Sequence, residues 1–132
     1  MTSTEVLGNT AADGGGVYND SGIIVDFTSS TIRGNHASAD GGGVYGAGGD
    51  AEEFFTGSTI SGNRAGARGG GIYNRSEVAA NETHIIRNRA PRGGGGIYDD
   101  GADASAALTD SAVSGNTPDN CEPPGSIAGC TG

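Results

Sequence analysis

The sequence has no lysine and no tryptophan, and its seven basic side chains, all arginine, stand against 16 carboxylates. The resulting net charge of −9 argues against a nucleic-acid-binding protein, because contacts with phosphates need a basic face. No apolar run approaches the ~18 residues of a membrane-spanning helix, so we expect no membrane span. The first residues contain neither a basic nor an apolar region, so we expect no signal peptide within this chain.

Large apolar residues are also scarce, since Leu, Ile, Val and Phe number only 20 of 132, whereas Gly and Pro together number 31. Such a composition is typical of a disordered chain. A repeat excludes that interpretation. An apolar residue, two variable residues and an asparagine are followed by Ala, a glycine triplet and Val-Tyr or Ile-Tyr, and the pattern recurs at intervals of 26, 28, 25 and 28 residues. Its asparagines are Asn9, Asn35, Asn63, Asn88 and Asn116.

Each repeat contains three short apolar stretches separated by Gly, Asn, Asp and Ser, which is the signature of strands and turns. No segment keeps the spacing of an amphipathic helix. We therefore predict an all-β parallel β-helix, or solenoid, of about five short coils over residues 1–118, starting near residues 4, 30, 58, 83 and 111, with a C-terminal cap at 119–132. Equivalent residues should stack in three columns, because no coil can bury its apolar residues alone. The columns are Val6, Ile32, Ile60, Ile85 and Val113; Val17, Val44, Ile72 and Ile97; and Phe27, Phe55, Ala80 and Leu108.

The repeated asparagine has two expected roles. Asparagine tolerates the left-handed backbone of a sharp corner. Stacked carboxamides also donate and accept hydrogen bonds along the axis, so we predict a structural ladder of all five.

The motif resembles the repeats of chlamydial polymorphic outer-membrane proteins and the right-handed parallel β-helix repeats of other secreted and cell-surface bacterial proteins. That superfamily includes pectate lyases, polygalacturonases and adhesins, so the resemblance implies the architecture, its right-handedness and an extracellular or cell-surface location. The tail that contains Cys121 and Cys130 looks like the C-terminal ends of actinobacterial members.

Two cysteines in a small glycine-rich protein indicate a disulfide of an extracytoplasmic protein. Cys121 and Cys130 would close a short ring that covers the last coil. A metal site is the alternative, which the absence of a nearby histidine disfavours. The first coil has no such cover, and its open edge could support end-to-end association.

Four tyrosines each follow an inward Val or Ile, so strand alternation should point them outward as an exposed stripe. Such a stripe could bind saccharide or a protein partner, and the alternative is ring stacking that stiffens the sheet. The four are Tyr18, Tyr45, Tyr73 and Tyr98.

Asp13 and Asp40 directly precede their glycine triplets and should lie in neighbouring coils, with His36 in the same coil as Asp40. Paired carboxylates cleave glycosides in many enzymes, so these three are the weak catalytic candidates. The alternative is a structural contact of Asp40 with Arg68, which occupies the equivalent place in the third coil.

Six of the seven arginines lie between Arg64 and Arg92. Arg64 and Arg89 follow their ladder asparagines, as His36 does, and could form an anion-binding strip for ligands such as uronates. Compensation of acidic loops at 50–53 and 99–100 is the alternative. We expect no metal and no cofactor.

The sequence therefore predicts a non-enzymatic secreted or cell-surface module, structural or adhesive, whose partner would be a polysaccharide or another surface protein. One alternative is a miniature or fragment of a polysaccharide lyase or glycoside hydrolase. The other is a solenoid that associates end to end through its first coil.

Overall fold

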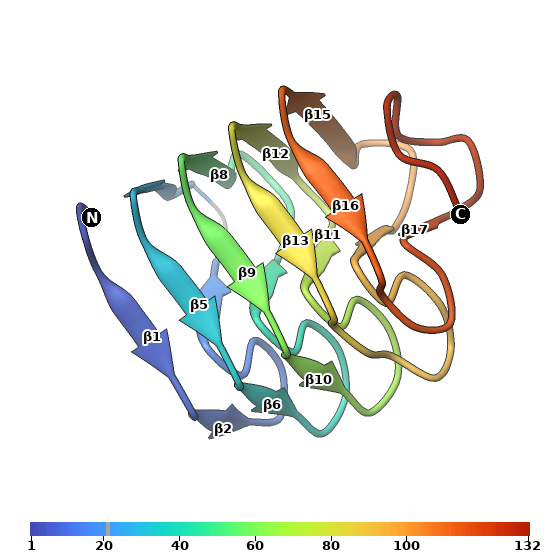
Figure 1. The fold of residues 1–132 in the computed structure, drawn as a ribbon, viewed down its shortest axis with the longest axis horizontal. Coiled ribbons are helices and arrows are strands. Elements are labelled where there is room, and N and C mark those ends of the chain that lie inside the picture. Colours follow the sequence, from blue (N-terminus) through green and yellow to red (C-terminus); the bar gives the residue numbers. More distant parts are fainter. Residues whose placement is uncertain (21) are drawn as a thin grey trace.

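The chain winds into a parallel β-solenoid in the computed structural model, which describes residues 1–20 and 22–132. Figure 1 shows the turns stacked side by side, with the N-terminus at one end of the stack and the C-terminus at the other. The described residues contain strands and turns but no helix, so none of them forms a helix able to cross a membrane. The prediction of an all-β parallel solenoid is confirmed.

Seventeen short strands occur in the described residues, and each of the first three turns contains four of them. The first turn contains β1 (Glu5–Leu7), β2 (Thr10–Ala11), β3 (Val17–Asn19) and β4 (Ile24–Thr28). The second contains β5 (Thr31–Arg33), β6 (His36–Ala37), β7 (Val44–Gly46) and β8 (Glu52–Thr56). The third contains β9 (Thr59–Ser61), β10 (Arg64–Ala65), β11 (Ile72–Asn74) and β12 (Glu77–Asn81). The remaining strands are β13 (His84–Ile86), β14 (Ile97–Asp99), β15 (Ser105–Thr109), β16 (Ala112–Ser114) and β17 (Cys121–Glu122).

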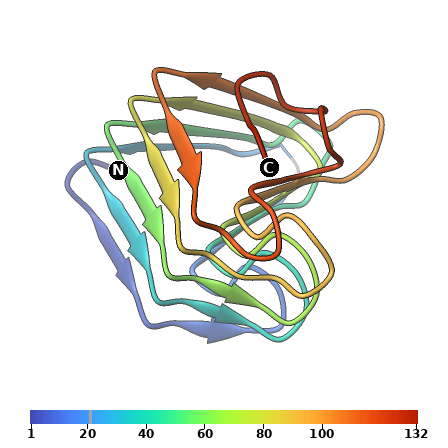
Figure 2. The same ribbon diagram turned by 45° about the vertical axis from the view of Figure 1, so that its right-hand side comes forward.

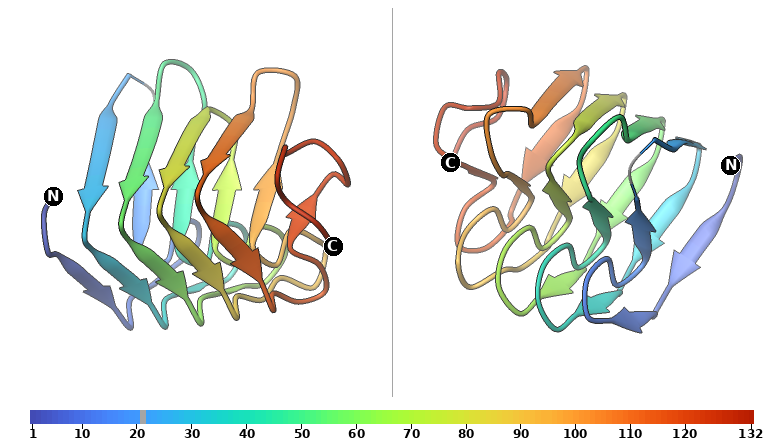
Figure 3. Two further views of the ribbon diagram at one scale, coloured as in Figure 1. Left: turned by 45° about the horizontal axis from the view of Figure 1, so that its top comes forward. Right: turned by 180° about the vertical axis from the view of Figure 1, so that it is seen from behind.

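The strands form four parallel sheets that run along the stack. Their orders are β1-β5-β9-β13-β16, β2-β6-β10, β3-β7-β11-β14-β17 and β4-β8-β12-β15. The first sheet faces the viewer in Figure 2, and the view from behind in Figure 3 shows the others closing the coil. The solenoid has four full turns and a shortened fifth, because β17 follows β16 and no strand of the fourth sheet comes after it.

The three predicted apolar columns pair in register along these sheets. Val6 pairs with Ile32, Val17 with Val44, and Phe27 with Phe55, and the later turns continue each column. The Phe27 and Phe55 rings stack at a centroid distance of 5.4 Å. Side chains in the middle turns are fully buried although each turn contributes only a few, because like residues cover one another.

The glycine triplets let the backbone of one turn approach the ladder of the next. A Cβ on Gly43 would lie 2.6 Å from the Gly71 carbonyl oxygen and 3.0 Å from Asn63 Nδ2. A side chain at this position would therefore displace the neighbouring turn, which explains why glycine recurs before each Val-Tyr or Ile-Tyr pair.

The left-handed backbone that we expected at the ladder asparagines lies one residue earlier in the chain. The residue with left-handed backbone is the one before each asparagine, with φ of 62–66° at its four glycines and 57° at Arg87, and not the asparagine itself. Glycine adopts this conformation at no steric cost, so the asparagine side chain is free for hydrogen bonding. The four glycines are Gly8, Gly34, Gly62 and Gly115.

The C-terminal tail folds over the last turn. Cys121 and Cys130 form the predicted disulfide, with Cα atoms 6.3 Å apart. β17, which contains Cys121, adds to the edge of β14, and Ile127 is buried in the apolar core. The cap is therefore in part an extension of a sheet and in part an apolar plug.

Candidate functional site

The five repeated asparagines lie in one column between the first and second sheets. Each donates its amide Nδ2 to the Oδ1 atom of the asparagine in the next turn, over 3.0–3.1 Å. The same Oδ1 accepts the backbone N–H of the preceding asparagine at 2.8–2.9 Å. Asn120, which the repeat does not predict, ends the column because its Oδ1 accepts both donors of Asn116.

The four tyrosines form a continuous stack on the outside of the third sheet. Neighbouring ring centroids are 4.9–5.7 Å apart and the ring planes lie within 19° of parallel. The tyrosines differ in exposure, which the prediction of an exposed stripe does not include: Tyr18 is 55% exposed, Tyr45 and Tyr98 are half-buried, and Tyr73 is only 2% exposed. The ring faces point along the stack and cover one another, so mainly ring edges reach solvent.

A cluster of charges covers Tyr73. The Arg68 guanidinium lies 4.9 Å from the Tyr73 ring centroid and 5.3 Å from that of Tyr98, within range of a cation–π contact. The Tyr73 hydroxyl donates to Asp100. Burial, together with this hydrogen bond, raises the pKa of Tyr73 above its usual value. A neutral phenol beside the guanidinium is therefore the stable form.

Asp13 and Asp40 do lie in neighbouring turns, but their oxygens bind the next turn. Asp13 Oδ1 accepts the backbone N–H of Asp40 at 3.0 Å. Both oxygens of Asp40 accept side-chain bonds from Arg68, at 3.2 and 2.9 Å, and Oδ1 also accepts its backbone N–H. The bond to Asp40 raises the pKa of Arg68. This geometry matches the alternative expectation of a structural contact between turns.

His36 and Arg64 on the second sheet, with Arg89 bridged to its edge, form an exposed column, whereas the tyrosines lie on the third sheet. His36 pairs with Arg64 in the strand ladder, and a single bridge joins Arg64 to Arg89. The structure brings the three together, and anion binding by them stays a prediction.

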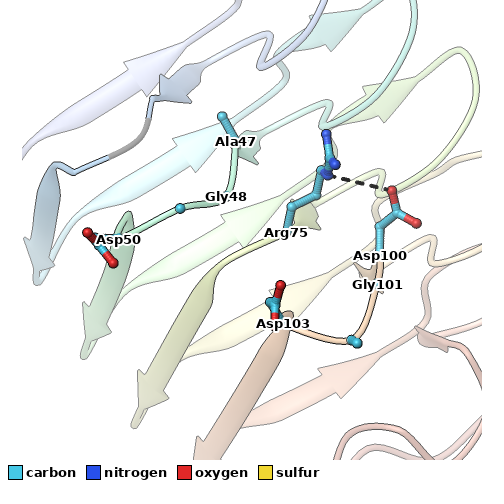
Figure 4. Close-up of a pocket in the computed structure, with 9 residues that line it drawn as sticks. Ala47, Gly48, Asp50, Arg75, Asp100, Gly101 and Asp103 are labelled. Atoms are coloured by element: carbon cyan, nitrogen blue, oxygen red, sulfur yellow. Dashed lines mark ion pairs between the residues drawn. The ribbon is translucent and has the colours of Figure 1, made fainter.

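A cleft of about 320 Å³ lies beside the tyrosine stack (Figure 4). Its walls are the five-residue loops at 47–51 and 100–104, and its floor is the two-residue loop at 75–76 between β11 and β12. Asp50, Asp100 and Asp103 supply carboxylates and Arg75 supplies a guanidinium, while small residues fill the rest of the lining. Figure 4 shows Arg75 directed at Asp100, with 3.9 Å between Nε and Oδ2.

Two carboxylates that the sequence analysis assigns to acidic loops lie on strands instead, and both are buried. Glu53 lies on β8 with its side chain inside the solenoid, where its oxygens accept bonds from Asn19 Nδ2 at 2.7 Å and from the Ser76 hydroxyl at 3.0 Å. Burial raises the pKa of Glu53, although these two bonds oppose the shift. Asp99 is also buried, which raises its pKa, and it accepts a bond from Asn74 at 2.9 Å.

We expect Glu53→Gln to stabilise the protein at neutral pH. The raised pKa means that the folded chain holds this proton more tightly than the unfolded chain, so the free energy of unfolding falls as pH rises from the ordinary value of 4.5 through the folded pKa. Glutamine removes the cost of the buried charge and keeps an acceptor for Asn19 and a donor for Ser76.

Urea unfolding across pH measures this effect. The variant should have the higher midpoint at pH 7, and the two proteins should converge below pH 4.5, where Glu53 is protonated in both states. Glu52→Gln is the matched control, since Glu52 is half-exposed on the same strand, and it should not reproduce the gain. A midpoint gap that persisted unchanged in acid would contradict the assignment to the Glu53 charge.

Some contacts in this region escaped the sequence interpretation, which gave Arg68 only its bond to Asp40 and gave Arg75 no role. Arg68 contacts the tyrosine stack and Arg75 lines its cleft, whereas the predicted ligand arginines do neither. The sequence contains one signal of the cleft, because one repeat is 25 residues long and the repeats on either side of it are 28. The shorter repeat has a shorter loop after its tyrosine strand, and the cleft lies over that loop, between the two longer loops. The repeat does mark position 53 as inward, because it is equivalent to Val25 and Val78, but the sequence interpretation assigned Glu53 to an acidic loop.

Comparison with known families supports the resemblance in part. Residues 29–47 and 57–75 match the Chlamydia polymorphic membrane protein repeat, and together they make up less than a third of the chain. Each segment spans a strand of the first, second and third sheets, with the ladder asparagine, the glycine triplet and the tyrosine. No curated protein and no solved structure matches the chain. The chain is thus similar to these repeats in its second and third turns.

Proposed function

We propose that the chain is a non-enzymatic structural module of a bacterial cell surface. One observation supports this function. The two segments that are similar to the membrane-protein repeat contain the residues that bind each turn to its neighbour. The ladder asparagines, the glycines and the stacked tyrosines all contact the equivalent residue of a neighbouring turn. A stack built in this way is a rigid support for the loops along its side.

Surface exposure is testable in the bacterium that produces the protein. Protease treatment of intact cells should cleave the chain in the loops at 47–51 and 100–104, because these loops lie outside the strands. Protection in intact cells, with cleavage only after lysis, would contradict a surface location.

We further propose that the cleft beside the tyrosines binds a neutral saccharide. The lining of this small cleft suits a sugar, because sugar hydroxyl groups can donate hydrogen bonds to its carboxylates and accept them from its guanidinium. Three carboxylates against one guanidinium disfavour uronates at this site. The tyrosine faces are less suitable as a platform because they cover one another.

Binding of neutral and acidic glycans to the whole protein, measured on an array and then by calorimetry, tests this site. Arg75→Ala and Asp103→Asn should each weaken binding of a neutral glycan by about tenfold, the effect of one lost charged hydrogen bond. Arg92→Ala is the matched control, because Arg92 is exposed on a different loop. Equal loss with all three variants, or binding restricted to uronates, would contradict the cleft as the site.

A further inference from the structure

The corner between the first and second sheets is basic, although the chain as a whole is acidic. Figure 1 shows this corner where β5 leads into β6 and β9 leads into β10. In each turn it consists of the five residues centred on the ladder asparagine, at 7–11, 33–37, 61–65, 86–90 and 114–118. We call these segments the basic corner, because they contain no Asp or Glu and their charged or titratable residues are Arg33, His36, Arg64, Arg87 and Arg89. The net charge of −9 thus divides into +4 on the basic corner and −13 elsewhere.

The arginines of the basic corner have no carboxylate partner. Their side chains and that of His36 are all exposed. Among residues 1–20 and 22–132, arginine ion pairs form only at Arg68 and Arg75, which contact Asp40 and Asp100. Compensation of acidic loops, the alternative to anion binding, therefore applies to these two arginines and does not explain the basic corner.

Arg87 occupies a position that favours glycine. Its backbone is left-handed, with φ of 57°, and the other four turns have glycine at the same place. A residue with a Cβ is strained in this conformation. In the part of the chain that the structure describes, the exposed Arg87 side chain forms no ion pair that would offset the strain. Backbone strain without a structural reason is typical of residues that contact a ligand.

The basic side chains repeat at the spacing of the turns. His36 pairs in register with Arg64, and Arg64 is bridged to Arg89, so the three side chains project from neighbouring turns. Neighbouring strands of a sheet lie about 4.8 Å apart, and the pairing fixes that distance. Like charges so close together repel each other, and an anion that lies along the row removes the repulsion. One sugar unit of an extended polysaccharide spans about the same length, so successive turns present a basic group to successive sugars.

The surroundings of the basic corner favour a thin, linear ligand. Carboxylates lie on both sides of it, in the segments that follow the second sheet and near the start of the strands of the first, and they are Asp13, Asp40, Asp119, Glu5, Glu82 and Asp110. A wide anionic surface, such as a membrane or a nucleic-acid duplex, would meet these carboxylates together with the arginines. Apart from His36, the basic corner has no aromatic side chain on which the bases of a single strand could stack.

We propose that the basic corner binds a linear anionic polysaccharide that lies along the axis of the solenoid. The arginines bind the acid groups of the chain, carboxylate or sulfate, because the planar guanidinium donates two parallel hydrogen bonds to such an oxyanion. Thr10 and Thr117, which continue the column of His36, Arg64 and Arg89 at its two ends, supply hydroxyl groups for the sugars. This site is separate from the cleft, and it does not depend on the binding of a neutral saccharide there.

Calorimetry of the whole protein with polysaccharides at low salt tests the proposal. The probes are dextran sulfate, polygalacturonate and neutral dextran, and the first two distinguish a sulfate from a carboxylate ligand. At least one of the two anionic chains should bind, more weakly as sodium chloride is raised, whereas dextran should not bind at the basic corner. The absence of binding by both anionic chains overturns the proposal, and so does equally tight binding of single-stranded DNA of the same length.

The repeat itself supplies the variants that identify the surface. Arg64→Thr and Arg89→Thr introduce the residue that the first and fifth turns have in the same column, so the fold should be preserved. Together they should weaken binding of the anionic chain by about tenfold, a few-fold for each exposed charge. Ser105→Asp with Thr109→Asp is the matched control, because it changes the net charge equally at exposed positions of β15. Equal weakening by both pairs would mean that net charge alone determines binding, and it overturns the basic corner as the site.

Arg87→Gly separates binding from folding. Glycine is the residue of the other four turns at this place, and it relieves the strained backbone. The variant should bind the anionic chain about threefold more weakly, while its urea midpoint stays equal to or above that of the wild type. A lower midpoint with unchanged binding would assign Arg87 to folding and overturn its part in the site.

Discussion

Asn63→Ala should lower the free energy of unfolding by about 3–5 kcal/mol, because each buried polar group left without a partner costs about 1–3 kcal/mol. Asn63 is at the centre of the ladder and fully buried. Its Oδ1 accepts two bonds from Asn35, and its Nδ2 donates to Asn88 and to the Ile32 carbonyl at 3.0 Å. Alanine leaves the amide of Asn35 and the carbonyl of Ile32 unpaired inside the stack.

Urea unfolding followed by circular dichroism measures the loss. Asn9→Ala removes the exposed end of the same ladder and should cost less than about 1 kcal/mol, since its groups reach water. Asn81→Ala, outside the ladder and half-exposed, should stay within about 0.5 kcal/mol of the wild type. Similar losses at all three positions would show that the ladder contributes no more than any other asparagine.

The repeat predicts the fold in detail because every copy obeys the same geometric constraint. Once the turns stack, a column such as Val6, Ile32 and Ile60 follows from the sequence spacing alone. The disulfide follows from the two cysteines in the same direct way. Features that depend on a difference between copies are harder to predict, because the repeat pattern describes only what the copies share.

The exposure of the tyrosines shows this limit. Strand alternation predicts that all four side chains point outward, and it contains no information on what covers them. Tyr73 is the most covered of the four, because Arg68 of its own turn lies over its ring and Asp100 of the next turn accepts the bond from its hydroxyl. The cleft and its arginine are likewise products of loop lengths that vary between turns.

The buried carboxylate of Glu53 has its origin in another difference between copies. The residue after each tyrosine points inward, and it is Asn19, Asn74 or Asp99 in three turns but Gly46 in the second. Asn74 and Asp99 are hydrogen-bonded to each other along the axis. Glu53 fills the gap beside Gly46, where its carboxylate accepts the bond from Asn19 that a side chain at position 46 would otherwise accept. The Glu53 carboxylate therefore occupies the space that is left by the absence of a side chain at Gly46.

This pairing predicts strong coupling between two substitutions. Gly46→Asn alone should destabilise the protein by about 2–3 kcal/mol, because its Cβ would lie 2.7 Å from Ser76 Oγ and 2.8 Å from Glu53 Oε2. Glu53→Val alone removes the shortest bond of Asn19 Nδ2, which keeps the Ile23 carbonyl, and one of the two acceptors of the Ser76 hydroxyl, so it should also destabilise. The double variant places an asparagine between Asn19 and Asn74 and a valine between Val25 and Val78.

The double variant should recover most of the loss, with a coupling of about 2 kcal/mol between the two sites, within the range found for residues in contact. The four proteins of the cycle are compared by urea unfolding at pH 7, where the wild type also bears the cost of the buried charge. Gly57→Asn combined with Glu53→Val is the control, because position 57 lies at a corner outside this column. Additive losses at positions 46 and 53 would mean that Glu53 does not replace a missing side chain, and that its burial has another cause.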